Sequence, residues 1–137
     1  SRESAGIIEK QTANITNSNL DALEATHQLK AQSVKMKEAI LMGEIDQLGK
    51  IMHDGWQFKK MMANGISNSE IDAIYETAMQ NGATGGKISG AGGGGYFFFY
   101  CPLVSRTRLI ESLVPFGITV QQYHFTKEGL YTYTVNR

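Results

Sequence analysis

Apolar residues in the first part of the chain recur three and four positions apart, which is the spacing of amphipathic helices. Polar capping residues and glycines divide this part into segments. We expect four helices here: one capped by Ser4 that carries Ile7, Ile8 and Ile15, one capped by Asn17 or Ser18 that ends at Met42, one from Glu44 to about Ala63, and one that follows the capping box Ser67-Asn68-Ser69-Glu70 and ends near Asn81-Gly82.

The second of these segments has a regular apolar repeat. Leu20, His27, Val34 and Leu41 recur every seven residues, and Gly43 stands where a left-handed C-terminal residue would end the helix. The pattern predicts that this stripe, including His27, faces the core or an interface. We expect the second and third helices to pack as an antiparallel hairpin.

The rest of the chain favours strands. The aromatic run at residues 96–100 indicates a strand buried on both faces, and residues 105–114 have helical spacing. Alternating apolar positions predict two more strands, at 118–125 with a bulge near Gln121-Gln122 and at 130–135. The expected fold class is α+β: one domain over residues 1–137, with a helical part at 4–82 and, at 83–137, a glycine loop and an antiparallel sheet of about three to four strands packed with helices.

Composition excludes several functions. The thirteen basic and thirteen acidic residues cancel and form no block, so nothing supports binding to nucleic acid. No apolar stretch approaches the length of a membrane span. With a single cysteine, Cys101, no internal disulfide can form, and a cytoplasmic location is expected.

The candidate chemistry lies in one segment, because seven of the eleven residues from Gly85 to Gly95 are glycine. A Walker loop requires a leading glycine and Gly-Lys-Ser/Thr, but the corresponding positions hold Asn81 and Ile88. Gly90, Gly92 and Gly95 satisfy G-x-G-x-x-G, yet a dinucleotide fingerprint precedes a helix and this segment precedes a strand. Both standard phosphate motifs are therefore excluded.

Two interpretations of the segment remain. Its backbone N–H groups could form an anion-binding nest, with Lys87 and Ser89 as side-chain donors. Alternatively, the glycines could form a bend where another backbone packs closely. Lys59, on the third predicted helix, is a possible substrate contact or part of a solvated helix face.

No catalytic or metal-binding residue is predicted in this chain. His27, His53 and His124 lie far apart without metal-ligand spacing. Ser89 has no base near it in the sequence that could activate it as a nucleophile.

Several motifs, taken together, resemble the C-terminal domain of the GHMP kinases, most closely the D-glycero-D-manno-heptose 7-phosphate kinases. They are Trp56-Gln57-Phe58-Lys59-Lys60, Gly65-Ile66-Ser67-Asn68, Ile71-Asp72-Ala73-Ile74-Tyr75, Gly82-Ala83-Thr84-Gly85-Gly86-Lys87 and Ser89-Gly90-Ala91-Gly92-Gly93-Gly94-Gly95. The last is the most specific, and the likeness runs from about Arg2 to the last predicted strand.

The resemblance implies a function for an intact enzyme. Such an enzyme transfers the γ-phosphoryl group of ATP, with Mg²⁺, to the anomeric hydroxyl of heptose 7-phosphate or of a related sugar such as fucose. By position, the phosphate and substrate loop of the family falls on Lys87, Ser89, Gly90, Ala91, Gly92, Gly93 and Gly94.

The sequence also departs from the family. The loop that holds the ATP phosphates is absent, so the resemblance implies that ATP and Mg²⁺ are bound mainly by an N-terminal half that this sequence does not contain. The start at Ser1 fits a piece of a longer protein, and we expect the 137-residue chain alone to be inactive. Two alternatives stay open: a non-catalytic module for small-molecule binding or dimerisation, and a structural helical hairpin, which leaves the glycines unexplained.

Overall fold

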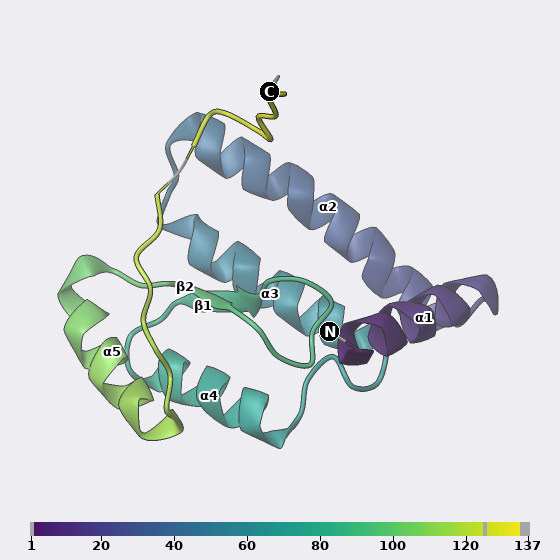
Figure 1. Ribbon diagram of the computed structural model, residues 1–137, viewed down its shortest axis with the longest axis horizontal. Helices are drawn as coiled ribbons and strands as arrows, with labels where there is room; N and C mark the ends of the chain where they lie inside the picture. The colour runs from purple at the N-terminus through teal and green to yellow at the C-terminus, as the bar shows by residue number, and fades with distance from the viewer. Residues whose placement is uncertain (1, 125, 135–137) are drawn as a thin grey trace.

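The computed structural model describes residues 2–124 and 126–134. Helices form most of the regular structure, and two strands lie between α3 and α4 (Figure 1). The elements are α1 (Arg2–Thr16), α2 (Leu20–Met42), α3 (Gln47–Met61), α4 (Ser69–Gln80), β1 (Gly85–Ile88), β2 (Phe97–Tyr100), the 3₁₀ turn η1 (Leu103–Ser105), α5 (Arg106–Leu113) and the 3₁₀ turn η2 (Val114–Phe116).

The helices follow the predicted segments, with shifts at their starts. α2 is capped by Asn19, whose side chain accepts a hydrogen bond from Ala22 N at 3.0 Å, rather than by Asn17 or Ser18. Gly43 ends α2 in the left-handed conformation, as predicted. α4 is capped by Asn68, one residue later than the expected Ser67. The shifts follow from the Asn side chains, whose amide oxygens reach the free N–H groups of the first turn.

The apolar stripe of α2 does not face the core, and its placement at an interface stays a prediction. Leu20 is 79% exposed and Leu41 74% exposed, and Val34 and His27 are exposed as well. The buried positions are instead the small residues Ala22, Ala25 and Ala39. Alanines let the α2 backbone approach its neighbours closely, and α2 lies beside α3 as the predicted hairpin (Figure 1).

Glycine also sets the distance between α3 and β1. Gly49 and Gly55 of α3 are buried, and the carbonyl group of Gly49 fills the space where a side chain on Gly85 would lie. Both positions must be glycine for such an approach, because a Cβ on either residue would push the two backbones apart. α3 therefore rests directly on the start of β1.

The core consists of two connected clusters. In the first, Trp56, Ile66 and Ile88 are fully buried. The second joins α4 to α5 through residues that include Ala78 and Leu109. Phe97 and Phe99 of β2 pack against both clusters, and their rings stack with centroids 5.1 Å apart.

The sheet is smaller than the alternation predicts. β1 and β2 pair antiparallel, with Gly85 opposite Tyr100 and Ile88 opposite Phe97, and they are the strands of the described residues. Residues 118–124 and 126–134 form neither helix nor strand, whereas Phe125 and Val135 lie outside the described residues. Alternation alone makes no strand without a neighbouring edge for its backbone groups, and Leu130 here is 95% exposed.

The aromatic run is also less buried than expected. Phe97 and Phe99 point into the core, but Tyr96 is 62% exposed and Phe98 39% exposed. Phe98 contacts the ring of Tyr123 edge-on, with centroids 5.7 Å apart. β2 therefore has one core face and one face that is partly open.

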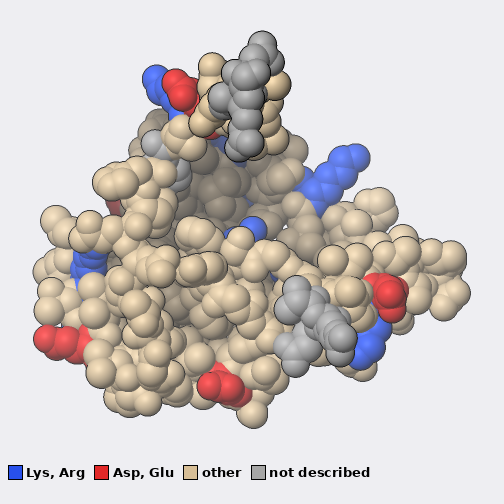
Figure 2. All heavy atoms as spheres, in the orientation of Figure 1, with Lys and Arg blue, Asp and Glu red and all other residues tan. Residues whose placement is uncertain are grey.

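Charged side chains are scattered over the surface shown in Figure 2, where no region of one sign stands out. None of the described helices combines the length and apolar character that a membrane crossing requires.

Candidate functional site

The glycine loop is closed by the hairpin of β1 and β2. Ser89 N donates to Tyr96 O at 2.8 Å, so the ladder ends there and residues 90–95 form the loop. All five loop glycines have positive φ, from 73° at Gly93 to 141° at Gly94. Side chains rarely adopt this backbone conformation, so the composition of the segment follows from its geometry.

The middle of the loop is anchored to distant segments. Gly93 N donates to the carbonyl oxygen of Ile66 at 2.9 Å, in the connection between α3 and α4. A Cβ on Gly92 would lie 2.7 Å from the same oxygen, and one on Gly93 would lie 2.7 Å from Ile7 Cδ1. The predicted close approach of another backbone is therefore confirmed at Gly92, whereas the close atom at Gly93 belongs to a side chain.

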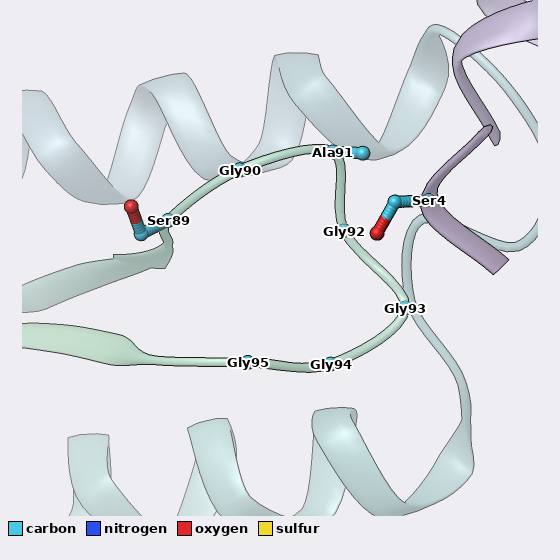
Figure 3. A pocket seen from close by; sticks show the side chains of 8 residues that line it. All are labelled: Ser4, Ser89, Gly90, Ala91, Gly92, Gly93, Gly94 and Gly95. Atoms are coloured by element: carbon cyan, nitrogen blue, oxygen red, sulfur yellow. The ribbon is translucent and has the colours of Figure 1, made fainter. Parts of the chain in front are cut away.

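The loop encloses a hollow of about 300 Å³, lined by Ser4 and residues 89–95. Figure 3 shows the Ser4 side chain, on α1, pointing toward the loop beside Gly92. The Ser89 hydroxyl and the Ala91 methyl group point away from the interior of the loop in this view. In this view the interior of the loop is bordered by main chain, and Ser4 lies on the outer side of Gly92.

The loop has unused hydrogen-bond donors. Within the described residues, main-chain acceptors are found for the N–H groups of Ser89 and Gly93, and none for those of the loop's other residues (Gly90, Ala91, Gly92, Gly94 and Gly95). Successive free N–H groups in a concave turn are suited to oxyanions. The anion-nest interpretation is thus compatible with close packing at Gly92, and it stays a prediction.

Two lysines lie near this loop. Lys87 is exposed on β1, opposite Phe98. Lys59 is half-buried on α3 and donates a hydrogen bond from Nζ to the carbonyl oxygen of Gly90. Burial lowers the pKa of Lys59, and the positive charge of Lys87 lowers it further. The structure therefore brings Lys59, Lys87 and the loop together, while Lys60 forms an ion pair with Asp72 at 3.5 Å.

A partly buried pair of side chains was missed in the sequence. His53 Nδ1 lies 2.9 Å from the hydroxyl oxygen of Tyr75, joining α3 to α4. The two residues are 22 positions apart, so no local spacing could have indicated the contact. Burial raises the pKa of Tyr75 to about 12; a backbone hydrogen bond from Gly86 opposes the rise, and the Asp54 carboxylate adds to it.

The wild-type protein should lose stability at alkaline pH because of Tyr75, and replacing Tyr75 with phenylalanine should remove this loss. Because the pKa of Tyr75 is raised from 10.0 to about 12 in the folded state, the unfolded chain loses its proton first as the pH rises through this window. Stability should fall there by up to about 1.4 kcal/mol per pH unit. Urea unfolding at pH 8, 10 and 11 checks this, with Tyr96→Phe at an exposed position as the control; an equally steep fall in Tyr75→Phe would contradict it.

Metal ligands do not gather in the described part of the chain: no three His, Cys, Asp or Glu side chains there could hold one ion. The groups near the loop are donors and cations, namely backbone N–H groups, Lys59 and Lys87. Such a set fits the phosphate groups of a nucleotide or sugar phosphate. It does not fit Mg²⁺, which requires oxygen ligands.

Comparison with known proteins connects this site to an enzyme family. The family described as GHMP kinases C terminal matches residues 36–115, more than half of the chain. A curated relative from Campylobacter jejuni, D-glycero-alpha-D-manno-heptose 7-phosphate kinase, is 36% identical over 114 residues. These residues make up 83% of this chain and 34% of the relative, so the chain spans about a third of the relative's length.

Two solved structures have a similar fold. A Campylobacter jejuni protein described as a sugar kinase is 41% identical, with a TM-score of 0.58 over 78% of this chain and 33% of that one. The L. major mevalonate kinase in complex with R-mevalonate has a TM-score of 0.72 at 19% identity, over 82% of this chain and 34% of that one. At that identity the second match supports the fold alone.

Proposed function

The chain belongs to the GHMP kinases, as their C-terminal part, and from this premise we propose that it is one domain, residues 1–137, of an ATP-dependent sugar kinase. In the intact protein, ATP and Mg²⁺ would be bound mainly by an N-terminal half. The substrate we propose is D-glycero-D-manno-heptose 7-phosphate, phosphorylated at its anomeric hydroxyl in the cytoplasm. The name of the 36% identical relative supports this choice over a related sugar such as fucose.

The observation that carries the proposal is the glycine loop, whose N–H groups at Ala91 and Gly92 have no main-chain acceptor, together with two nearby lysines, Lys59 and Lys87. Phosphoryl transfer depends mainly on positioning the reacting groups and on neutralising the charge of the transferred phosphoryl group. Fixed backbone donors and ammonium groups can do both without an acid or base in this chain. The loop would thus hold phosphate oxygens while the other half supplies the metal and the remaining chemistry.

The test is a kinase assay of the intact gene product that contains this chain. ADP release should depend on D-glycero-D-manno-heptose 7-phosphate, with fucose and mannose as comparison sugars, and the product should carry a second phosphate on the anomeric carbon. We expect residues 1–137 alone to give no turnover. Turnover by this chain alone would contradict the assignment of ATP to the other half.

The other function class remains distinguishable in the same assay. If the intact protein binds the sugar phosphate tightly but releases no ADP with any sugar, the kinase proposal fails, and a small-molecule-binding or dimerisation module replaces it. If fucose is used faster than the heptose phosphate, the kinase proposal holds and the choice of substrate is wrong.

A further inference from the structure

We infer that Lys59 is a positioning residue, whose ammonium group holds the glycine loop in the conformation that presents its free N–H groups. The contact that carries the inference is the hydrogen bond from Lys59 Nζ to the carbonyl oxygen of Gly90. The inference rests on the proposed function, since it names a residue on which binding at the same loop depends.

Gly90 has little else to hold it. Its φ is 92°, and no atom lies within 4 Å of the place where its Cβ would be. No side chain of its own packs against a neighbour, and a glycine peptide rotates easily. The bond from Lys59 therefore fixes the direction of the Gly90 carbonyl group, and with it the direction of the next N–H group, which belongs to Ala91.

The second fixed point lies three residues further on. Gly93 N is bound to Ile66 O at 2.9 Å, so the stretch between Gly90 and Gly93 is held at both ends. The two anchors come from the C-terminal half of α3 and from the connection that follows it. Between them lie the free N–H groups of Ala91 and Gly92. Loss of either anchor should let the peptide groups that carry these donors rotate.

The charge of Lys59 is used differently from that of nearby lysines. In the part of the chain that the structure describes, the carboxylate partners of lysines are Asp54 for Lys50, at 2.8 Å, and Asp72 for Lys60, at 3.5 Å. Lys59 instead donates its hydrogen bond to a neutral carbonyl group. It does so although it is half-buried and near the positive charge of Lys87. Hydrogen bonds from charged donors are stronger than neutral ones, which suits a fixing contact.

The experiment compares three variants of the intact protein. Lys59→Met removes the bond, Lys59→Arg keeps a cationic donor, and Lys60→Met is the matched control at the adjacent position. Without substrate, exchange of the Gly93 amide, whose N–H is bound to Ile66 O, should be about tenfold faster in Lys59→Met, the effect of losing one charge-assisted bond. Lys59→Arg should restore slow exchange, and Lys60→Met should leave the rate at the wild-type level.

Kinetics separate positioning from general destabilisation. In Lys59→Met the KM for the phosphate-bearing substrate should rise about tenfold, because loss of the same hydrogen bond should weaken substrate binding by the same factor. In Lys59→Arg the KM should return most of the way to the wild-type value. Loop exchange in Lys59→Met at the wild-type rate, or equal effects of Lys59→Met and Lys60→Met, would overturn the inference. If the intact protein phosphorylates no sugar, the proposed function fails, and the exchange measurement still decides the role of Lys59.

Discussion

Replacing Gly85 with alanine should lower the free energy of unfolding by about 3 kcal/mol, the upper part of the usual range for overpacking a close contact. The added Cβ would overlap the carbonyl group of Gly49 and would lie 3.0 Å from His53 N, both of which are backbone atoms of α3. A helix backbone cannot move aside as a side chain can. The strand would have to move away from the helix, and the packing of Ile88 in the core cluster that includes Trp56 would loosen with it.

The matched control is Gly6→Ala in α1, where no atom lies within 4 Å of the added Cβ. This change should be neutral or raise stability by up to about 1 kcal/mol, because alanine is the better helix former. Urea unfolding followed by circular dichroism measures both variants. A Gly85→Ala protein as stable as the wild type would show that α3 and β1 do not pack backbone to backbone.

The sequence predicts those features that depend on local geometry. Helical spacing identified α1 to α4, and Gly43 marks the end of α2 because a left-handed residue there needs no partner elsewhere. The loop conformation of the glycine segment was predictable for the same reason, since a run of positive φ angles requires glycine wherever the chain goes. Side-chain roles in the loop were less accessible, as the outward Ser89 hydroxyl shows.

Features that depend on distant partners could not be predicted. The seven-residue repeat of α2 predicted that Leu20 and Leu41 would be buried, whereas the alanines are. Hydrophobicity alone does not show that close helix packing favours small residues. The expected strands at 118–125 and 130–135 alternate correctly, but alternation supplies no neighbouring edge. The contact of Lys59 with Gly90 joins residues 31 positions apart, and nothing in either segment indicates it.

One helix connects the stability of this fold to its proposed site. α3 contacts the start of the hairpin through Gly49 at Gly85 and reaches the loop through Lys59 at Gly90. Because α3 is rigid and makes both contacts, a change in its packing at Gly85 should also alter its contact with Gly90. Destabilising the packing of α3 on β1 would then weaken anion binding without any change in the loop itself.

Replacing Gly92 with alanine should reduce kcat/KM of the intact kinase by about 100-fold, the scale of loss that a displacement of about 1 Å causes in a positioned site. Gly92 has a φ of 113°, which alanine rarely adopts, and the added Cβ would lie 2.7 Å from Ile66 O and 2.9 Å from Ile66 Cα. The loop must therefore move away from its anchor at Ile66. Its N–H groups would then be displaced from the positions that the proposed phosphate contacts require.

Gly94→Ala separates the two causes of this loss. Gly94 has a φ of 141° but no atom within 4 Å of the added Cβ, so this variant carries the backbone strain without the collision. Backbone strain alone costs about 1–3 kcal/mol and should leave Gly94→Ala more active than Gly92→Ala. Steady-state kinetics with urea unfolding of each variant gives the comparison. Equal losses would place the cause in strain, whereas a Gly92→Ala enzyme within twofold of wild type would remove the loop from the proposed chemistry.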